Sequence, residues 1–351
     1  MFIIQAVTTK LILYSHSDPA GTSMSKLLGI CIPTFNRAGY LRENLDSIVP
    51  QFAVHGLPIF ISDNCSDDGT DIVVKQFQAI YPNIQYRKNS ENIGAYRNIL
   101  AAIKMATTEY IWMMGDDDKV IEGAVDRILE RLKTNIDFVV LNSIGYNSTM
   151  QIRNGNGIKC SEDRTIQKGS HEALITYLSG AYHGFMSSMI IKRSIISNLV
   201  EEFDDVSFAQ FGNSWLPLML FYKAIVNKIG IIICDPALQS RLNHRPDKRN
   251  FFQYFYIDHL SALLYLRKCG YGLRCLKKAA YLGPQSITVQ MLRGGGDKGK
   301  LSIYRNFIKH CAIIPLTDKF TFLVVERLPT NVMRALTNVV SEISPDTKMH
   351  F

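Results

Sequence analysis

Residues 110–121 read YIWMMGDDDKVI, a short apolar run that ends at a glycine and three adjacent aspartates. Apolar runs of this length, bounded by turn residues, are typical of a strand buried in a parallel sheet. Asp116, Asp117 and Asp118 repel one another, so a fold keeps them together only if a cation, backbone donors or water offsets the repulsion. The stretch therefore predicts a buried strand whose carboxyl end bears an acidic site.

On both sides of this stretch, short apolar runs alternate with segments of helical periodicity. The predicted strands cover residues 27–33, 57–64, 83–89, 109–115 and 137–143. The predicted helices between them cover residues 39–52, 69–81, 95–106 and 122–133. On the second of these helices, the periodicity places Ile72, Val73, Phe77 and Ile80 on the core side. The alternation predicts an α/β domain of three layers with a mostly parallel sheet.

Composition limits the remaining possibilities. The seven cysteines are scattered and odd in number and form no CxxC pair, which predicts reduced thiols in the cytosol, with neither a disulfide framework nor a zinc site. No run of about 20 apolar residues is present, so we predict no transmembrane helix. Residues 1–24 lack the pattern of a signal peptide and are expected to be an extension outside the fold.

The net charge of +8 is unevenly distributed. Residues 1–244 hold 22 basic and 24 acidic side chains, whereas residues 245–351 hold 17 basic and 7 acidic ones. Helical segments in this last third mix aromatic, aliphatic and basic residues. Such segments favour contact with an anionic surface, and a packed helical subdomain with a solvated basic face explains them equally well.

Three polar clusters follow predicted strands, at the point where each strand ends. They are PTFNR at residues 33–37, SDNCSDDGT at 62–70 and GDDD at 115–118. Ligands of parallel α/β sheets bind beyond the carboxyl ends of the strands, so we expect the clusters to meet at one sheet edge.

The three aspartates offer hard oxygen ligands with no histidine or cysteine nearby, which suits Mg²⁺ or Mn²⁺ rather than zinc. Mg²⁺ usually takes one or two carboxylates and completes its shell with water and phosphate oxygens. Asp116 and Asp118 are therefore expected metal ligands, and Asp116 and Asp117 are expected to lie at a diphosphate. The other interpretation is an acidic cap on the following helix.

Two further stretches offer contacts for a nucleotide. Asp63 ends the second strand and is expected to accept hydrogen bonds from a base or ribose, with a turn-forming aspartate as the alternative. Asn92 and Gly94 precede a helix whose first turn bears Arg97, an arrangement that suits an anion. A simply capped helix explains these residues equally well.

Together, ICIPTFNR, ISDNCSDDGT, NSENIGAYRNI and WMMGDDDKVIEGAV resemble the family 2 glycosyltransferases with the GT-A fold. The chain is similar in particular to bacterial O-antigen and capsule sugar transferases of the abequosyltransferase-like branch. The resemblance implies a GT-A (Rossmann-like) domain over residues 25–245. That domain would comprise a nucleotide-sugar half (25–145) and an acceptor half (146–245), followed by a helical basic region over 246–351.

The resemblance also implies roles by position. It places Pro33, Thr34 and Arg37 at the nucleoside, Asp63 at the base, and the D-x-D motif of Asp116 to Asp118 at the metal and the diphosphate. Many members read D-A-D-D at this motif, whereas this chain has Gly115 in the first place.

The family usually supplies a catalytic carboxylate from an E-D pair near the start of a later helix, where this chain has Asn213 and Ser214. An inverting displacement needs a base for the proton of the acceptor hydroxyl. Asp204, Asp205 and His183 are the substitute candidates, although each also fits a solvated loop.

The stretch SRLNHRPDKR resembles a loop that members place over the diphosphate. His244 is expected to complete the metal shell, with Arg241 or Arg245 at the phosphates. As bare residues they equally fit a surface loop.

The resemblance implies a metal-dependent, inverting hexosyl- or deoxyhexosyltransferase that uses a nucleotide-diphosphate sugar and Mg²⁺ or Mn²⁺. The expected acceptor is a lipid-linked precursor of a surface polysaccharide. The expected location is the cytoplasm, with peripheral contact on the cytoplasmic face of the inner membrane through residues 246–351. No nucleic acid is expected as a partner.

Three alternatives stay open. The missing E-D pair allows a catalytically inactive GT-A scaffold. A nucleotidyltransferase shares such acidic strand ends but usually has a Gly-rich loop where this chain reads PTFNRAGY. A nucleic-acid-binding protein would use the basic region, although no known binding motif is present there.

Overall fold

The computed structural model describes residues 25–178, 184–204, 215–241, 258–280 and 311–314, together with Arg327 and Val332. These residues divide into two compact units. The first unit contains the described residues of 25–169, 185–204 and 227–241. The second contains those of 170–184, 215–226 and 258–314, together with Arg327 and Val332. The second unit thus takes residues 170–178 and 215–226 from the predicted acceptor half.

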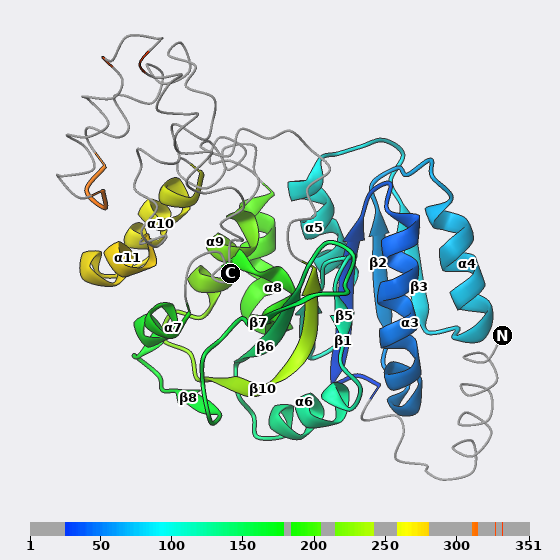
Figure 1. The fold of residues 1–351 in the computed structure, drawn as a ribbon, viewed down its shortest axis with the longest axis horizontal. Coiled ribbons are helices and arrows are strands. Elements are labelled where there is room, and N and C mark those ends of the chain that lie inside the picture. The colour runs from blue at the N-terminus through cyan, green and yellow to red at the C-terminus, as the bar shows by residue number, and fades with distance from the viewer. Residues whose placement is uncertain are drawn as a thin grey trace. The chain divides into compact units, whose positions relative to one another are not determined.

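Ten strands in the described part of the first unit form one sheet (Figure 1). They are β1 (Leu28–Thr34), β2 (Ile59–Asp63), β3 (Ile84–Lys88), β4 (Tyr110–Met113), β5 (Lys119–Val120), β6 (Phe138–Tyr146), β7 (Arg153–Asn156), β8 (Arg164–Ile166), β9 (Met189–Lys192) and β10 (Gly230–Arg241). The main order is β3-β2-β1-β4-β9-β6-β10-β5. β3, β2, β1 and β4 are parallel, which confirms the predicted α/β class.

The other half of the sheet is mixed. β9 lies antiparallel between β4 and β6, and β10 then runs parallel to β6. A register shift interrupts the β10–β6 pairing between Ile233 and Leu238, so the far end of β10 continues beside β6 to Arg241. The short strand β5, directly after the acidic loop, pairs antiparallel with β10.

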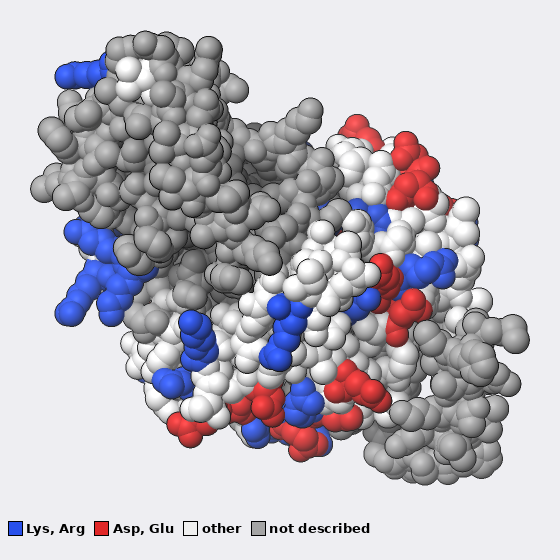
Figure 2. Space-filling model, viewed as in Figure 1, with Lys and Arg blue, Asp and Glu red and all other residues white. Residues whose placement is uncertain are grey.

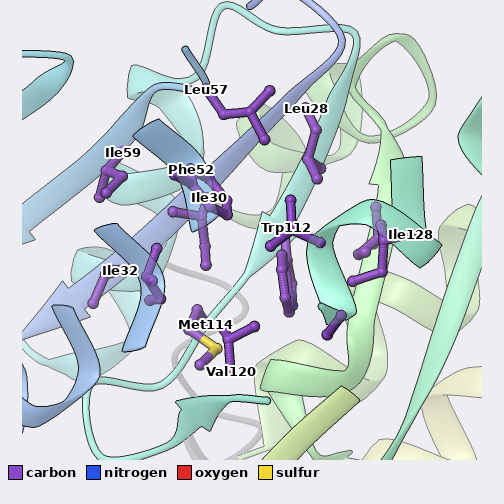
Figure 3. Packing of buried hydrophobic residues seen from close by; sticks show 14 of the residues in the cluster. Leu28, Ile30, Ile32, Phe52, Leu57, Ile59, Trp112, Met114, Val120 and Ile128 are labelled. Carbon is purple, nitrogen blue, oxygen red and sulfur yellow. The ribbon is translucent and has the colours of Figure 1, made fainter. Parts of the chain in front are cut away.

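Helices cover both faces of this sheet. The first unit contains α3 (Ala38–His55), α4 (Thr70–Ile80), α5 (Ala95–Met105), α6 (Ala124–Leu132) and α8 (Arg193–Phe203), with a 3₁₀ turn, η2 (Met186–Ser188). Side chains of α3, α4 and α6 pack with alternate residues of β1, β2 and β4 in one apolar cluster. Figure 3 shows Trp112 at its centre, with Phe52 of α3 and Ile128 of α6 nearby.

On the opposite face, α5 packs against β1 and β2. Gly29 permits a close approach there, because an added Cβ would lie 2.6 Å from the Phe60 ring and 2.7 Å from Thr108 Oγ1. The predicted three layers are therefore present, with α3, α4 and α6 on one side of the sheet and α5 on the other.

The predicted inner face of α4 is partly wrong. Val73 and Phe77 are buried as expected, but Ile72 is 57% exposed and Val74 is buried instead. The helix begins at Thr70, and its contact stripe follows positions 70, 73, 74 and 77, which leaves Ile72 on the solvent side.

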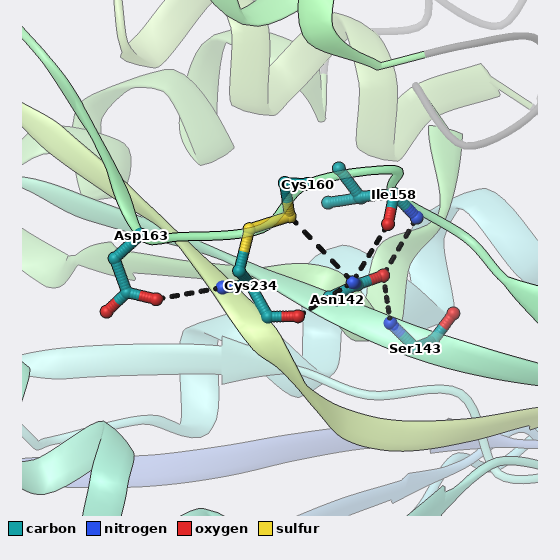
Figure 4. Close-up of a disulfide and its surroundings, with 6 residues drawn as sticks. All are labelled: Asn142, Ser143, Ile158, Cys160, Asp163 and Cys234. Carbon is teal, nitrogen blue, oxygen red and sulfur yellow. Dashed lines mark hydrogen bonds between the residues drawn. A yellow bond between two sulfur atoms is a disulfide. The ribbon is translucent and has the colours of Figure 1, made fainter.

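A disulfide joins Cys160 to Cys234, which corrects the prediction that all cysteines are reduced (Figure 4). The two residues are 74 positions apart in sequence, and β10 brings Cys234 next to the loop before β8. The Asn142 side chain lies beneath the bond and donates to the carbonyl oxygens of Ile158 (3.0 Å) and Cys234 (2.8 Å). Sequence spacing alone gave no signal for this pairing.

The second unit is helical in its described part. It contains α7 (His171–Tyr177), α9 (Leu216–Ala224), α10 (His259–Lys268) and α11 (Leu273–Ala279). The Tyr271 hydroxyl donates to the Tyr222 carbonyl at 2.8 Å, and the Gly272 amide donates to Glu172 Oε1 at 2.6 Å. Among the described helices, none combines the length and apolar character that crossing a bilayer requires.

Candidate functional site

The loops after β1 and β2 are joined by hydrogen bonds at the carboxyl ends of the strands. The Asn36 amide donates to Ser66 Oγ at 2.8 Å, and the Asp67 amide donates to Asn36 Oδ1 at 2.9 Å. Asn36 (φ 51°) and Cys65 (φ 67°) both adopt the left-handed region. Because non-glycine residues rarely adopt it, the surrounding bonds must hold these two loops in place.

A buried amide on α5 fixes the spacing of β1 and β2. Asn98 Nδ2 donates to the carbonyl oxygens of Thr34 (3.2 Å) and Ser62 (3.0 Å), and its Oδ1 accepts from Ser62 Oγ at 2.7 Å. Both strand ends are thus tied to one side chain. This bonding satisfies polar groups that would otherwise be costly to bury.

Asp63 is fully buried at the end of β2. Its Oδ1 accepts hydrogen bonds from the Ser66 amide (2.9 Å) and Ser66 Oγ (2.5 Å), and its Oδ2 accepts one from the Tyr86 hydroxyl (2.5 Å). The carboxylate therefore holds the β2 loop in this structure. Because Asp63 is fully buried, a base could bind to it directly only if the groups around it moved.

The acidic loop after β4 lies against the end of β1. Asp116 accepts a hydrogen bond from Thr34 Oγ1 at 2.8 Å and forms an ion pair with Arg37 at 2.8 Å. Arg37 also lies 3.2 Å from Asp117. Two of the predicted clusters therefore meet through direct side-chain contacts.

Asp118 is buried and bonded to two further elements. Its Oδ2 accepts from Ser187 Oγ of η2 at 2.5 Å, and its Oδ1 accepts from the Arg241 amide at the end of β10 at 3.0 Å. From α3, Asn44 Nδ2 donates to the carbonyl oxygens of Gly115 (3.1 Å) and Asp118 (2.8 Å). The loop is thus held by β1, α3, η2 and β10 together.

The Arg241 side chain is only 3% exposed and is occupied by the protein itself. Its guanidinium donates to Glu43 Oε2 (2.8 Å), the Asp117 carbonyl (3.2 Å) and the Ser148 carbonyl (2.6 Å). It also lies over the Tyr40 ring, 4.9 Å from the centroid. These contacts leave the expectation that Arg241 neutralises phosphate without structural support, because the guanidinium donates to Glu43 and to the Asp117 and Ser148 carbonyls.

Burial and like charge shape the ionisation of the acidic loop. Burial, followed by the charge of Asp117, raises the pKa of Asp116 and of Asp118. Burial works against the charge on Arg37, but Asp116 and Asp117 outweigh it and raise the pKa of Arg37. Arg37 is thus paired with two of the three carboxyl groups, and among the described residues Asp118 accepts only from Ser187 and the Arg241 amide, so the loop favours an added cation.

The three aspartates provide some, but not all, of the oxygen ligands that a hard divalent ion needs. No group of three or more His, Cys, Asp or Glu side chains in the described residues forms a ready cage for a metal. Mg²⁺ and Mn²⁺ need fewer protein ligands when phosphate and water complete the shell. Asp117 is the most exposed of the three aspartates, with 20% of its side chain accessible compared with 6% for Asp116. The carboxylates thus fit an ion that is shared with a bound diphosphate.

Comparison with known proteins identifies this domain. The family model described as glycosyl transferase family 2 matches residues 29–197. These residues belong to glycosyl transferase family 2. The matched segment contains β1, β2 and β4 with all three strand-end clusters, as the resemblance predicted.

Two curated relatives of the family 2 domain are similar over part of their length. Abequosyltransferase RfbV of Salmonella typhimurium is 28% identical over 218 residues, which cover 59% of this chain and 63% of that protein. GalNAc(5)-diNAcBac-PP-undecaprenol beta-1,3-glucosyltransferase of Campylobacter jejuni is 24% identical over 192 residues, which cover 54% and 59%. The chain thus spans less than two thirds of either relative.

Solved structures agree with the family 2 fold. The crystal structure of S. aureus TarS 1–349 in complex with UDP-GlcNAc matches with a TM-score of 0.56 at 15% identity, covering 92% of this chain and 89% of that one. A longer TarS structure gives a TM-score of 0.57 at 14% identity, covering 91% and 55%. These likenesses confirm the predicted GT-A-like fold.

Within the family 2 domain, the structure brings together Thr34, Arg37 and the three aspartates. Pro33 lies beside them in β1, paired in register with Ser62 of β2. Asn92 and Gly94 form the turn before α5, where Asn92 Oδ1 accepts from the Gly94 amide (2.9 Å) and from Asn64 (2.7 Å).

Other predicted residues are not joined to this cluster. Within the described residues, no hydrogen bond or ion pair joins Arg97 to this cluster, and Arg97 lines a separate cavity on α5. Asp204 ends α8 and pairs with Lys104 at 2.7 Å, so its proposed role as the base is without structural support. Asp205, His183, His244 and Arg245 lie outside the described residues, as do Asn213 and Ser214.

Four residues of the family 2 site were missed at the sequence level. Asn44 and Asn98 are buried polar side chains inside otherwise apolar helix stripes, and that pattern was a usable signal. Phe35 is an aromatic residue 41% exposed directly after Thr34, which also was visible in PTFNR. Ser187 comes from η2, 69 residues beyond Asp118, and no local pattern predicts that contact.

Proposed function

We propose that this family 2 domain transfers a sugar from a nucleotide-diphosphate donor to a precursor of a surface polysaccharide. The observation that supports it most is the acidic loop, held at the end of β4 against Thr34 and Arg37 of β1. The loop lies at the carboxyl ends of parallel strands, and sheets of this kind bind nucleotides at those ends. One relative is named for abequose transfer, and another name includes PP-undecaprenol, which supports a lipid-linked acceptor.

Asp117, with Asp116 and Asp118 behind it, would hold Mg²⁺ or Mn²⁺ at the donor. When bound, such an ion supplies charge neutralisation for the leaving diphosphate. Arg37 and Thr34 hold Asp116 in place, and the Arg241 amide and Ser187 do the same for Asp118.

The nucleoside half of the proposed site lies at the ends of β1 and β2. The exposed Phe35 ring is suited to stack on a base. Pro33 and Asp63 shape the floor beneath it, and the turn at Asn92 and Gly94 borders it through Asn64. We expect the base to contact this surface while the diphosphate lies at the aspartates.

The proposed displacement inverts the anomeric centre and needs a base for the acceptor hydroxyl. Asp205 and His183 are the candidates that stay in this proposal, and His244 stays as a candidate for the metal shell. A chain without any such base would be the inactive scaffold that the missing E-D pair allows.

Calorimetric titration of UDP, GDP, CDP and dTDP, each with and without Mn²⁺, tests the donor site. We expect one nucleoside diphosphate to bind about tenfold or more tightly with Mn²⁺, and Asp117→Asn to remove that gain. Asp126→Asn is the matched control, because its carboxylate is exposed on α6 beside His55. If Mn²⁺ makes no difference to the wild type, the aspartates are a structural cap and the proposal fails.

A turnover assay distinguishes an active transferase from an inactive scaffold that only binds the donor. The matching sugar nucleotide is incubated with the protein and Mn²⁺, and released nucleoside diphosphate is measured with and without a lipid-linked saccharide. Acceptor-dependent release supports the transferase. Tight, metal-dependent binding with no release under either condition favours the inactive scaffold.

The second unit offers a surface for the proposed membrane contact. Arg267 and Lys268 end α10, and Arg274, Lys277 and Lys278 lie on α11; all five are exposed. Residues 259–280 include no acidic side chain. Figure 2 shows Lys and Arg side chains gathered at α11. We propose that this patch contacts anionic lipid on the cytoplasmic face of the inner membrane.

Vesicle sedimentation tests this contact. Binding to vesicles with about 30% phosphatidylglycerol, lost in pure phosphatidylcholine and in 0.5 M salt, is expected because each basic residue adds about 1 kcal/mol near such a surface. Replacing Arg274, Lys277 and Lys278 with Gln should weaken binding strongly. Equal binding to both vesicle types would contradict the proposal.

A further inference from the structure

A cavity of about 650 Å³ lies along α5, within the first unit and apart from the acidic loop. Its wall includes Arg87 of β3, Arg97 and Lys104 of α5, and Asp204 at the end of α8. Ile93 and Met105 add apolar surface. None of these residues is among those that hold the acidic loop.

The backbone explains why two arginines face one cavity. β3 is an edge strand, and its Ile84 and Tyr86 point to the α3–α4 side, so Arg87 points to the α5 side. Arg97 is on the first turn of α5, and Lys104 follows seven residues later, about 10 Å along the axis. The cavity therefore extends along the helix from Arg97 to Lys104.

The charges in this cavity are compensated at one end only. Lys104 pairs with Asp204 at 2.7 Å and with Glu201 at 3.0 Å. Arg87 and Arg97 are exposed, and within the described residues no carboxylate lies at salt-bridge distance from either one. The end near the start of α5 is thus cationic, whereas at the other end Lys104 is paired with two carboxylates.

We propose that this cavity binds a phosphate or diphosphate ester, with Arg87 and Arg97 on the phosphate and the attached apolar group toward Ile93 and Met105. Arginine forms paired hydrogen bonds to phosphate oxygens, and an anion at the first turn of a helix gains from the helix dipole. Identifying the ester as the lipid-linked acceptor rests on the proposed function. The existence of the binding site does not depend on that function.

The test titrates the full chain in EDTA, so that any metal-dependent donor site is silent. The probes are inorganic pyrophosphate and farnesyl diphosphate, and the variants are Arg87→Gln and Arg97→Gln, alone and together. The control removes two positive charges elsewhere, with Arg42→Gln and Lys75→Gln on the α3–α4 side. We expect the double variant to weaken probe binding about tenfold or more and the control to change it by less than about twofold.

Comparison of the two probes identifies the source of the phosphate. Tighter binding of farnesyl diphosphate supports an apolar ester, whereas equal binding of both probes supports a free phosphate ligand at the same arginines. Two results overturn the site: no binding of either probe, or an equal loss of binding in the control variant. Loss of nucleotide binding at the acidic loop leaves this result unaffected, since the titration contains no metal.

Discussion

The Arg241→Met substitution tests whether the guanidinium is what holds the acidic loop. The side chain is almost fully buried and donates to two backbone carbonyls, those of Asp117 and Ser148. Methionine retains most of the length of the side chain but none of its donors. The Arg241 amide that reaches Asp118 is unchanged, so the variant removes only the side-chain contacts.

The expected loss can be estimated contact by contact. Each hydrogen bond to a carbonyl contributes about 0.5–1.5 kcal/mol net, and the contact with the Tyr40 ring adds about 0.5–1 kcal/mol. Glu43 is 44% exposed and keeps Lys119 at 2.8 Å, so its lost bond adds little. We therefore expect the free energy of unfolding to fall by about 2–3 kcal/mol.

Urea unfolding of the first unit measures this loss. The chain has two tryptophans, so a Trp215→Phe background leaves Trp112, in the core of the first unit, as the reporter. Arg131→Met is the matched control, because Arg131 pairs with Asp163 at 2.7 Å on an exposed surface and should cost less than about 1 kcal/mol. If the Arg241 and Arg131 variants lose the same stability, the buried guanidinium does not hold the loop.

Three other perturbations have defined outcomes. Gly29→Val should cost about 1–3 kcal/mol in the same assay, because its Cβ would enter the Phe60 ring; unchanged stability would refute the close approach. Burial lowers the pKa of His171, so its contribution to stability is present above pH 6.5 and is lost as the pH falls below that value. Calorimetry should show the wild type losing stability relative to His171→Phe as the pH falls, and a constant difference would refute it. Reduction of the disulfide between Cys160 and Cys234 should cost roughly 2–4 kcal/mol, and peptide mapping without reductant should find the two joined; separate peptides would contradict the bond.

The sequence predicted the parallel half of the sheet well, because its signals are local. β1, β2 and β4 are short apolar runs, β3 is a weaker and more polar strand, and each helix that follows has its own apolar stripe. The strand-end clusters follow from the same alternation, since parallel strands end at one edge. The contacts of Thr34 and Arg37 with Asp116 are a direct result of this topology.

The rest of the site depends on contacts between distant segments. β9 inserts between β4 and β6, and η2 thereby comes to lie beneath the acidic loop. β10 returns along β6 and brings Arg241 to Asp118, 123 residues away in sequence. Such pairings leave no periodicity in either segment, so neither the role of Ser187 nor the disulfide was predictable.

Asn44 holds the acidic loop by its backbone, through the carbonyl oxygens of Gly115 and Asp118. Every residue type has a backbone carbonyl oxygen, so these two hydrogen bonds do not depend on which side chains the loop contains. The side chain of Asp117 can therefore be exchanged while the path of the chain is kept. For protein engineering, substitutions in this loop can therefore alter ligand preference while Asn44 of α3 holds the loop backbone in place.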